Sequence, residues 1–71
     1  MTDTFELEKV IRQNGYTKKQ IAKEIGLSEQ GFLLKLNNKR EFKASEIQKI
    51  CILLKCSRDI FFVSEVNLIH S

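Results

Sequence analysis

Basic residues are concentrated in the middle of this sequence. Seven of them lie between residues 18 and 43, where three acidic residues leave a local net charge of +4. The rest of the chain carries −1, which gives +3 overall. Cations gathered in one segment are what a phosphate-binding surface requires, but a solvated lysine-rich face has the same composition. The seven are Lys18, Lys19, Lys23, Lys35, Lys39, Arg40 and Lys43.

Few of the other residues could perform catalysis or hold a metal. The chain has one histidine, His70, and two cysteines, Cys51 and Cys56, without the paired short spacings of a zinc site. Neither a nucleophile–base pairing nor a glycine-rich phosphate loop is visible. We therefore expect no enzyme activity, no metal, no cofactor and no small-molecule substrate.

The sequence also lacks targeting signals. No apolar run approaches the ~18 residues of a membrane span, and there is no secretory signal. Both cysteines lie in or beside an apolar helical stretch, where we expect them to stay reduced. These features predict a cytoplasmic protein with no membrane partner.

Helices are expected to position the cations. The 71 residues include no proline and three glycines, and apolar residues recur at helical spacing. We predict a compact all-α fold of five helices forming one domain over residues 1–71, with Phe5, Phe42, Phe61 and Phe62 in its core. The expected ranges are 4–14, 17–25, 29–37, 44–55 and a short fifth helix that contains Ile60, Phe61 and Phe62, followed by an extended tail over 63–71.

The second and third predicted helices form a helix-turn-helix over residues 17–38. Thr17 and Gln20 match a capping box at the start of this motif. Gly26 can adopt the positive φ that ends the first helix, and Ser28 can cap the second. So tight a turn makes the helices cross steeply, and the second could then enter the major groove of DNA. Many small helical proteins contain such a pair without binding DNA.

A helical wheel selects the side chains that could contact bases. At about 100° per residue, Gln30 and Leu34 point away from a core side that contains Phe32. The Gln30 amide could pair with an adenine edge, Leu34 could contact a thymine methyl, and Glu29 could accept from a cytosine amino group. Glu29 could instead only complement the helix dipole, Gln30 could simply face solvent, and Leu33 and Leu34 could belong to a protein interface.

Phosphate contacts are expected at the start of the second predicted helix and around both ends of the third. Lys18 could approach one strand through its ammonium and its backbone N–H. Loop solvation is the alternative for each lysine taken singly. The predicted phosphate contacts are Lys18, Ser28, Asn37, Lys39, Arg40 and Lys43.

The chain resembles a known family over about residues 5–62. The resemblance is carried by Gln20-Ile-Ala, Gly26-Leu-Ser and Lys35-Leu-Asn, followed by Ser45-Glu-Ile-Gln-Lys-Ile and Asp59-Ile-Phe-Phe. These segments are similar to the lambda-repressor-like helix-turn-helix proteins, also called Cro/cI or XRE-type, and especially to the small phage-encoded members. The resemblance implies a sequence-specific transcriptional regulator that binds double-stranded DNA, as a homodimer on a pseudo-palindromic operator.

The chain agrees with this family at Lys18 and departs from it at Leu34. The family uses the Lys18 position for phosphate contact, but Leu34 replaces a polar residue that the family often carries. The alternative function is a protein-interaction adapter or antirepressor on the same fold. Leu33, Leu34 and the apolar tail support this alternative.

Overall fold

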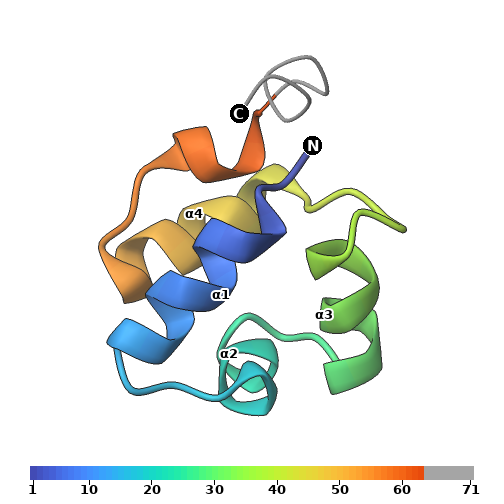
Figure 1. The fold of residues 1–71 in the computed structure, drawn as a ribbon. Coiled ribbons are helices and arrows are strands. Elements are labelled where there is room, and N and C mark those ends of the chain that lie inside the picture. The colour runs from blue at the N-terminus through green and yellow to red at the C-terminus, as the bar shows by residue number, and fades with distance from the viewer. Residues whose placement is uncertain (64–71) are drawn as a thin grey trace.

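The computed structural model describes residues 1–63, which contain four α-helices and one 3-10 helix (Figure 1). Within residues 1–63 no strand is present. The predicted all-α class is confirmed, and the first four helices begin and end within one residue of their expected bounds. The elements are α1 (Thr4–Gln13), α2 (Lys18–Glu24), α3 (Glu29–Leu36), α4 (Ala44–Leu54) and the 3-10 helix η1 (Arg58–Phe61).

The predicted fifth helix takes the 3-10 form. Ser57 caps it, because its hydroxyl accepts a hydrogen bond from the Asp59 N–H at 3.1 Å. The Ile60 carbonyl, however, accepts from the Asp3 N–H at 2.7 Å, so the segment is held by a partner distant in the sequence. The count of five α-helices is thus not confirmed, and the predicted tail lies, from residue 64 on, outside the described residues.

Side-chain caps fix the starts of α1, α2 and α3. The Thr17 hydroxyl accepts from the Gln20 N–H at 3.1 Å while the Gln20 side chain accepts from the Thr17 N–H at 2.8 Å. This is the predicted capping box. Asp3 caps α1 by accepting from the Glu6 N–H at 3.1 Å, and Ser28 caps α3 by accepting from the Gly31 N–H at 3.0 Å. Because each cap stabilises a helix start by about 1 kcal/mol, short-range sequence patterns suffice to locate these helices.

One apolar core joins all five elements. The α-helices, with the C-cap residue of α2, contribute residues three or four positions apart, which is the spacing of one helical face; η1 contributes one buried residue. Phe32, Leu7, Ile21, Leu36 and Ile50 are its largest fully buried side chains. The other buried apolar residues are Ile11, Ala22, Ile25, Ile47, Leu54 and Phe61.

The phenylalanines divide between core and surface. Phe42 packs edge-on against both Phe32 and Phe61, with ring centroids 5.9 and 5.3 Å apart. Phe5 and Phe62 are 76% and 67% exposed, so their assignment to the core was wrong. Phe5 lies about 200° around α1 from the buried Leu7, and Phe62 follows the buried Phe61 beyond the end of η1.

The N-terminal segment connects the end of α3 with residues 60–63. Met1 and Val63 exchange two backbone hydrogen bonds of 3.0 Å. On the other side, the Asn38 side chain accepts from the Thr2 N–H at 2.8 Å and donates to the Thr2 carbonyl at 2.9 Å. Asn38 has a positive φ of 63°. Chain segments far apart in the sequence are thus joined near the C-terminal end of α3.

Candidate nucleic-acid interface

The turn between α2 and α3 has the geometry that its sequence predicts. Gly26 has a φ of +81°, which interrupts helical geometry. The Leu27 N–H donates to the Ala22 carbonyl at 2.8 Å, and the Leu27 side chain packs against the core. Ser28 is extended, so α3 starts in a new direction. Figure 1 shows α3 at one edge of the molecule, joined to α2 by this turn.

The two sides of α3 differ in exposure. Phe32 and Leu36 are fully buried, while Glu29 and Gln30 are exposed. Leu33 and Leu34 are half-buried, and Leu33 packs against the core. A shallow, mainly apolar hollow lies on the outer side of α3 and is open to solvent. It is lined by Gln30, Leu33, Leu34, Asn37 and Lys39.

The loop after α3 presents exposed cations. Lys39, Arg40 and Lys43 are all exposed. The backbone N–H groups of Lys39 and Arg40 both donate to the Leu34 carbonyl, at 2.8 and 3.3 Å. These bonds hold the loop against α3. The exposed Asn37 donates its side-chain amide to the Leu33 carbonyl at 3.0 Å, and the exposed Ser28 uses its hydroxyl as the α3 cap.

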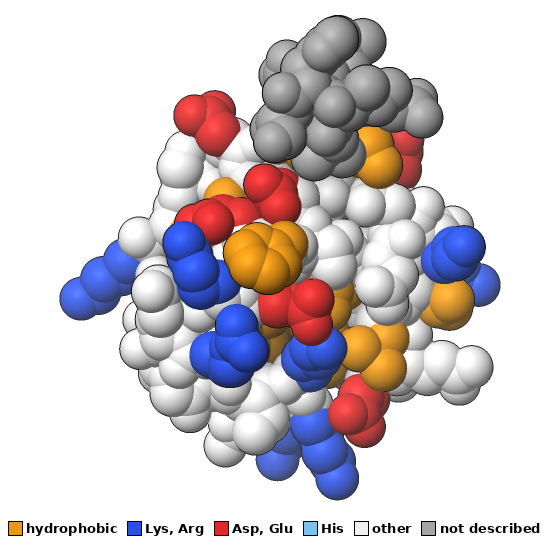
Figure 2. All heavy atoms as spheres, viewed as in Figure 1, with side chains coloured by type: hydrophobic (Ala, Val, Ile, Leu, Met, Phe, Trp, Pro, Cys, Tyr) orange, Lys and Arg blue, Asp and Glu red, His pale blue; other side chains and the backbone are white. Residues whose placement is uncertain are grey.

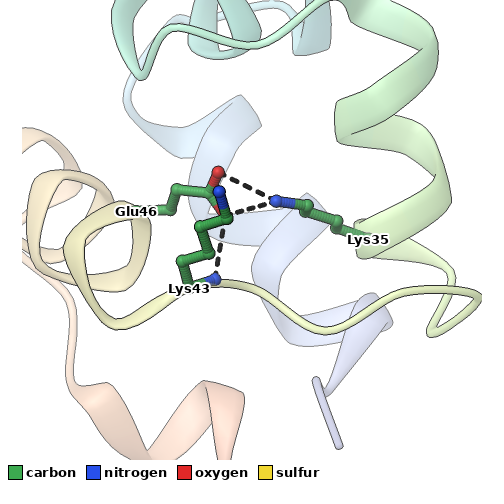
Figure 3. Close-up of polar contacts among 3 residues, drawn as sticks. All are labelled: Lys35, Lys43 and Glu46. Atoms are coloured by element: carbon green, nitrogen blue, oxygen red, sulfur yellow. Dashed lines mark hydrogen bonds and ion pairs between the residues drawn. The ribbon is translucent and has the colours of Figure 1, made fainter.

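Two of the seven basic residues between residues 18 and 43 are in ion pairs. The Lys18 ammonium lies 2.6 Å from the Glu8 carboxylate on α1, and both side chains are partly exposed. Lys35 is buried and lies 2.6 and 2.8 Å from the two carboxylate oxygens of Glu46 on α4 (Figure 3). The positive charge around α3 is therefore smaller than the basic residues of the sequence suggest.

Glu46 has a third partner in the structure. Its Oε1 accepts the backbone N–H of Lys43 at 2.9 Å, at the start of α4. Burial alone would raise the pKa of this carboxyl, but the hydrogen bonds from Lys35 and Lys43 and their charges outweigh burial and hold the pKa below its usual value. Glu46 is thus a buried carboxylate with its charge compensated.

Five cations remain on the surface of the segment from 18 to 43. Within residues 1–63 none of them forms an ion pair. Figure 2 shows basic side chains mixed with acidic ones on one face of the molecule, with basic side chains at the edge beside α3 and its following loop. The five are Lys19, Lys23, Lys39, Arg40 and Lys43.

A comparison with protein families decides the identity of this motif. The model of the Cro/C1-type HTH DNA-binding domain matches residues 6–59. The chain belongs to this family. Comparison with curated proteins and with solved structures gives no match.

The Cro/C1-type assignment confirms the resemblance found in the sequence, and it makes the chain a DNA-binding helix-turn-helix protein. The matched residues include all of α2, the turn and α3. Residues 1–5 and those from 60 onward lie outside the match. The segment pairing between Met1 and Val63 is therefore a feature of this chain that the family model does not describe.

Sequence reasoning missed the role of Lys35 in this Cro/C1-type domain. Lys35 was counted among the surface cations, yet it lies about 60° from Phe32 on the helical wheel, on the core side. That signal was present in the sequence. Its partner Glu46 is eleven residues away on another helix, and only the packing of α3 against α4 reveals it.

The described residues offer little support for a metal site, a reactive thiol or a membrane span. Between Met1 and Val63 no three His, Cys, Asp or Glu side chains form a group that could hold a metal ion. Burial and the neighbouring Cys51 raise the pKa of the Cys56 thiol to about 11, so this thiol stays protonated at neutral pH. Among these same residues, no helix is long and apolar enough to cross a membrane.

Proposed function

We propose that this Cro/C1-type protein is a sequence-specific transcriptional regulator that inserts α3 into the major groove of duplex DNA. One observation carries the proposal: α3 buries Phe32 and Leu36 while Gln30, on its other side, stays exposed beside an open hollow. A helix that is fixed by its core side and open on the other can present side chains to base edges.

We infer base contacts from the outer side of α3. The exposed Gln30 amide has the donor and acceptor that an adenine edge requires. Leu34 lines the apolar hollow beside it, which suits the methyl group of thymine. Glu29, exposed in the first turn of α3, would accept from a cytosine amino group.

We infer phosphate contacts from the exposed cations and polar groups at the two ends of the motif. Lys39, Arg40, Lys43 and Asn37 follow α3, where they would meet one strand. Lys18 would use its backbone N–H at the start of α2, because its ammonium lies beside Glu8. Ser28 would contact a phosphate at the start of α3.

The proposal extends to assembly. We propose that residues 1–71 act as one domain that binds as a homodimer, at least on DNA, to a pseudo-palindromic operator. One such small domain buries limited surface on DNA, and two half-sites one helical turn apart would add affinity. A repressor role and a phage or prophage origin are predictions from the family resemblance.

Selection of bound duplexes from a random pool at near-physiological salt tests this function. We expect enrichment of a two-fold symmetric site with A·T pairs in each half. Equal, weak retention of all duplexes would contradict sequence-specific regulation. Enrichment of an asymmetric single site would contradict the homodimer while leaving the base contacts in place.

A further inference from the structure

We propose that Lys35 and Glu46 are positioning residues for DNA recognition. Their buried ion pair holds the base-reading helix and the phosphate-contacting loop in one fixed relation. This inference rests on the proposed function, and neither residue is assigned a DNA contact. Both side chains are 9% exposed, which leaves little of either charged group accessible to a phosphate.

Figure 3 shows the bonds of Glu46 to Lys35 and Lys43, and backbone bonds at the start of the loop complete the connection. On α3, the Leu34 carbonyl accepts the backbone N–H groups of Lys39 and Arg40, which start the loop. At the end of the loop, the Lys43 N–H donates to Glu46 Oε1. Glu46 in turn binds Lys35, the residue next to Leu34. Both ends of loop 39–43 are therefore tied to the same point of α3.

The Lys35–Glu46 ion pair is better suited to fixing the orientation of α3 than to stabilising the fold. A buried ion pair contributes little net stability, because desolvation offsets its attraction, and apolar residues of similar volume can replace it without loss. A carboxylate that binds one ammonium through both oxygens does impose a direction. Apolar packing would leave α3, only eight residues long, more freedom to tilt at its C-terminal end.

The decisive variant is K35M/E46L, which exchanges the pair for apolar side chains. Its matched control is K9M/E6L, which removes the exposed pair on α1, where Lys9 and Glu6 are 3.1 Å apart. For each protein, the affinities for the selected duplex and for a scrambled duplex are measured over a salt series.

We expect K35M/E46L to keep its helical content and its affinity for the scrambled duplex, because the exposed cations remain. Its preference for the selected duplex should fall about tenfold, the equivalent of roughly one base contact. A preference within about twofold of wild type in the folded variant, or an equal fall in K9M/E6L, would overturn the inference.

A second variant covers the case in which K35M/E46L does not fold. E46Q keeps the size of the side chain and an oxygen for the Lys43 N–H, and removes the charge together with one of the two oxygens that accept from Lys35. We expect E46Q to fold and to lose part of the preference. An unchanged preference in folded E46Q would overturn the inference.

Hydrogen exchange separates this inference from the proposed function, because it needs no DNA. In E46Q the amides of Lys39 and Arg40 should exchange faster, while those of α1 should not change. Unchanged exchange at Lys39 and Arg40 would overturn the positioning role. If wild type shows no preference among duplexes but the exchange changes as expected, the proposed function fails and the coupling of helix and loop stands.

Discussion

Glu46 shows how one side chain can link several parts of a small fold. Its carboxylate accepts hydrogen bonds from the Lys35 ammonium and the Lys43 backbone. Burial works against the charged form, but the partners prevail and lower the pKa of this group. Because the folded state stabilises the ionised carboxylate, the unfolded chain takes up a proton at higher pH than the folded chain does.

A pH dependence of stability follows from that shift. The contribution of the Glu46 charge is present above its usual pKa, near 4.5, and is lost as the pH falls through the lower pKa of the folded state. Thermal melts from about pH 7 to pH 3 should therefore show a stability difference between wild type and E46Q that changes only below about pH 4.5. A difference that is constant over the whole range would contradict the lowered pKa of Glu46.

Single residues were predicted from the sequence when their partners are local. Thr17 with Gln20 and Ser28 with Gly31 lie three residues apart, so the spacing alone reveals the bond. Lys18 with Glu8 and Lys35 with Glu46 join different helices. No pattern along the chain indicates those pairs, because they form only when the core brings the helices together.

Among the elements, the turn from α2 to α3 depends most on one residue type. Gly26 has a φ of +81°, and a Cβ built there would meet no atom within 4 Å. Gly15, after α1, has a φ of +76° and is equally uncrowded. At both positions the cost of a side chain is thus conformational and not a clash.

We therefore expect Gly26→Ala to lose about 1 kcal/mol of stability, because a residue with a Cβ resists positive φ. Gly15→Ala is the matched control and should lose a similar amount. Urea unfolding of the two variants and wild type measures both losses. A Gly26→Ala protein as stable as wild type would show that the turn does not need its positive φ.

The element that departs from the prediction is η1. Apolar residues and the Ser57 cap predict a helix start, and that start is present. The Ile60 carbonyl in η1 accepts from the Asp3 N–H, and Val63, just after η1, pairs with Met1, so both bonds span nearly the whole chain. Such long-range backbone pairing leaves no periodic signal in a sequence of this kind, so the 3-10 form could not be read from the local pattern.

The molecule as a whole combines a shared apolar core with an uneven surface. The core uses residues from every element, whereas the exposed cations of segment 18–43 gather near α2, α3 and the following loop. With Lys35 and Lys18 held by carboxylates, Lys39 and Arg40 are the adjacent cations nearest the end of α3. They should carry a large share of the phosphate contacts.

Binding measurements over a salt series with K39A/R40A test how many phosphate contacts Lys39 and Arg40 make. The slope of log affinity against log salt should become shallower by about 0.9 for each phosphate that the variant no longer neutralises. K49A/R58A removes the same charge from exposed positions on α4 and η1, and its slope should stay closer to wild type. Equal slopes for the two variants would show that net charge, and not the loop after α3, determines the affinity.

The preference of Gln30→Ala for the selected duplex over a scrambled one shows directly whether the outer side of α3 reads the bases. Gln48→Ala is the control, since Gln48 is an exposed glutamine on α4. Removing a bidentate pair with a base should lower the preference of Gln30→Ala about tenfold or more, with unchanged affinity for the scrambled duplex. If Gln30→Ala keeps the wild-type preference, or Gln48→Ala loses it equally, the outer side of α3 does not read the bases.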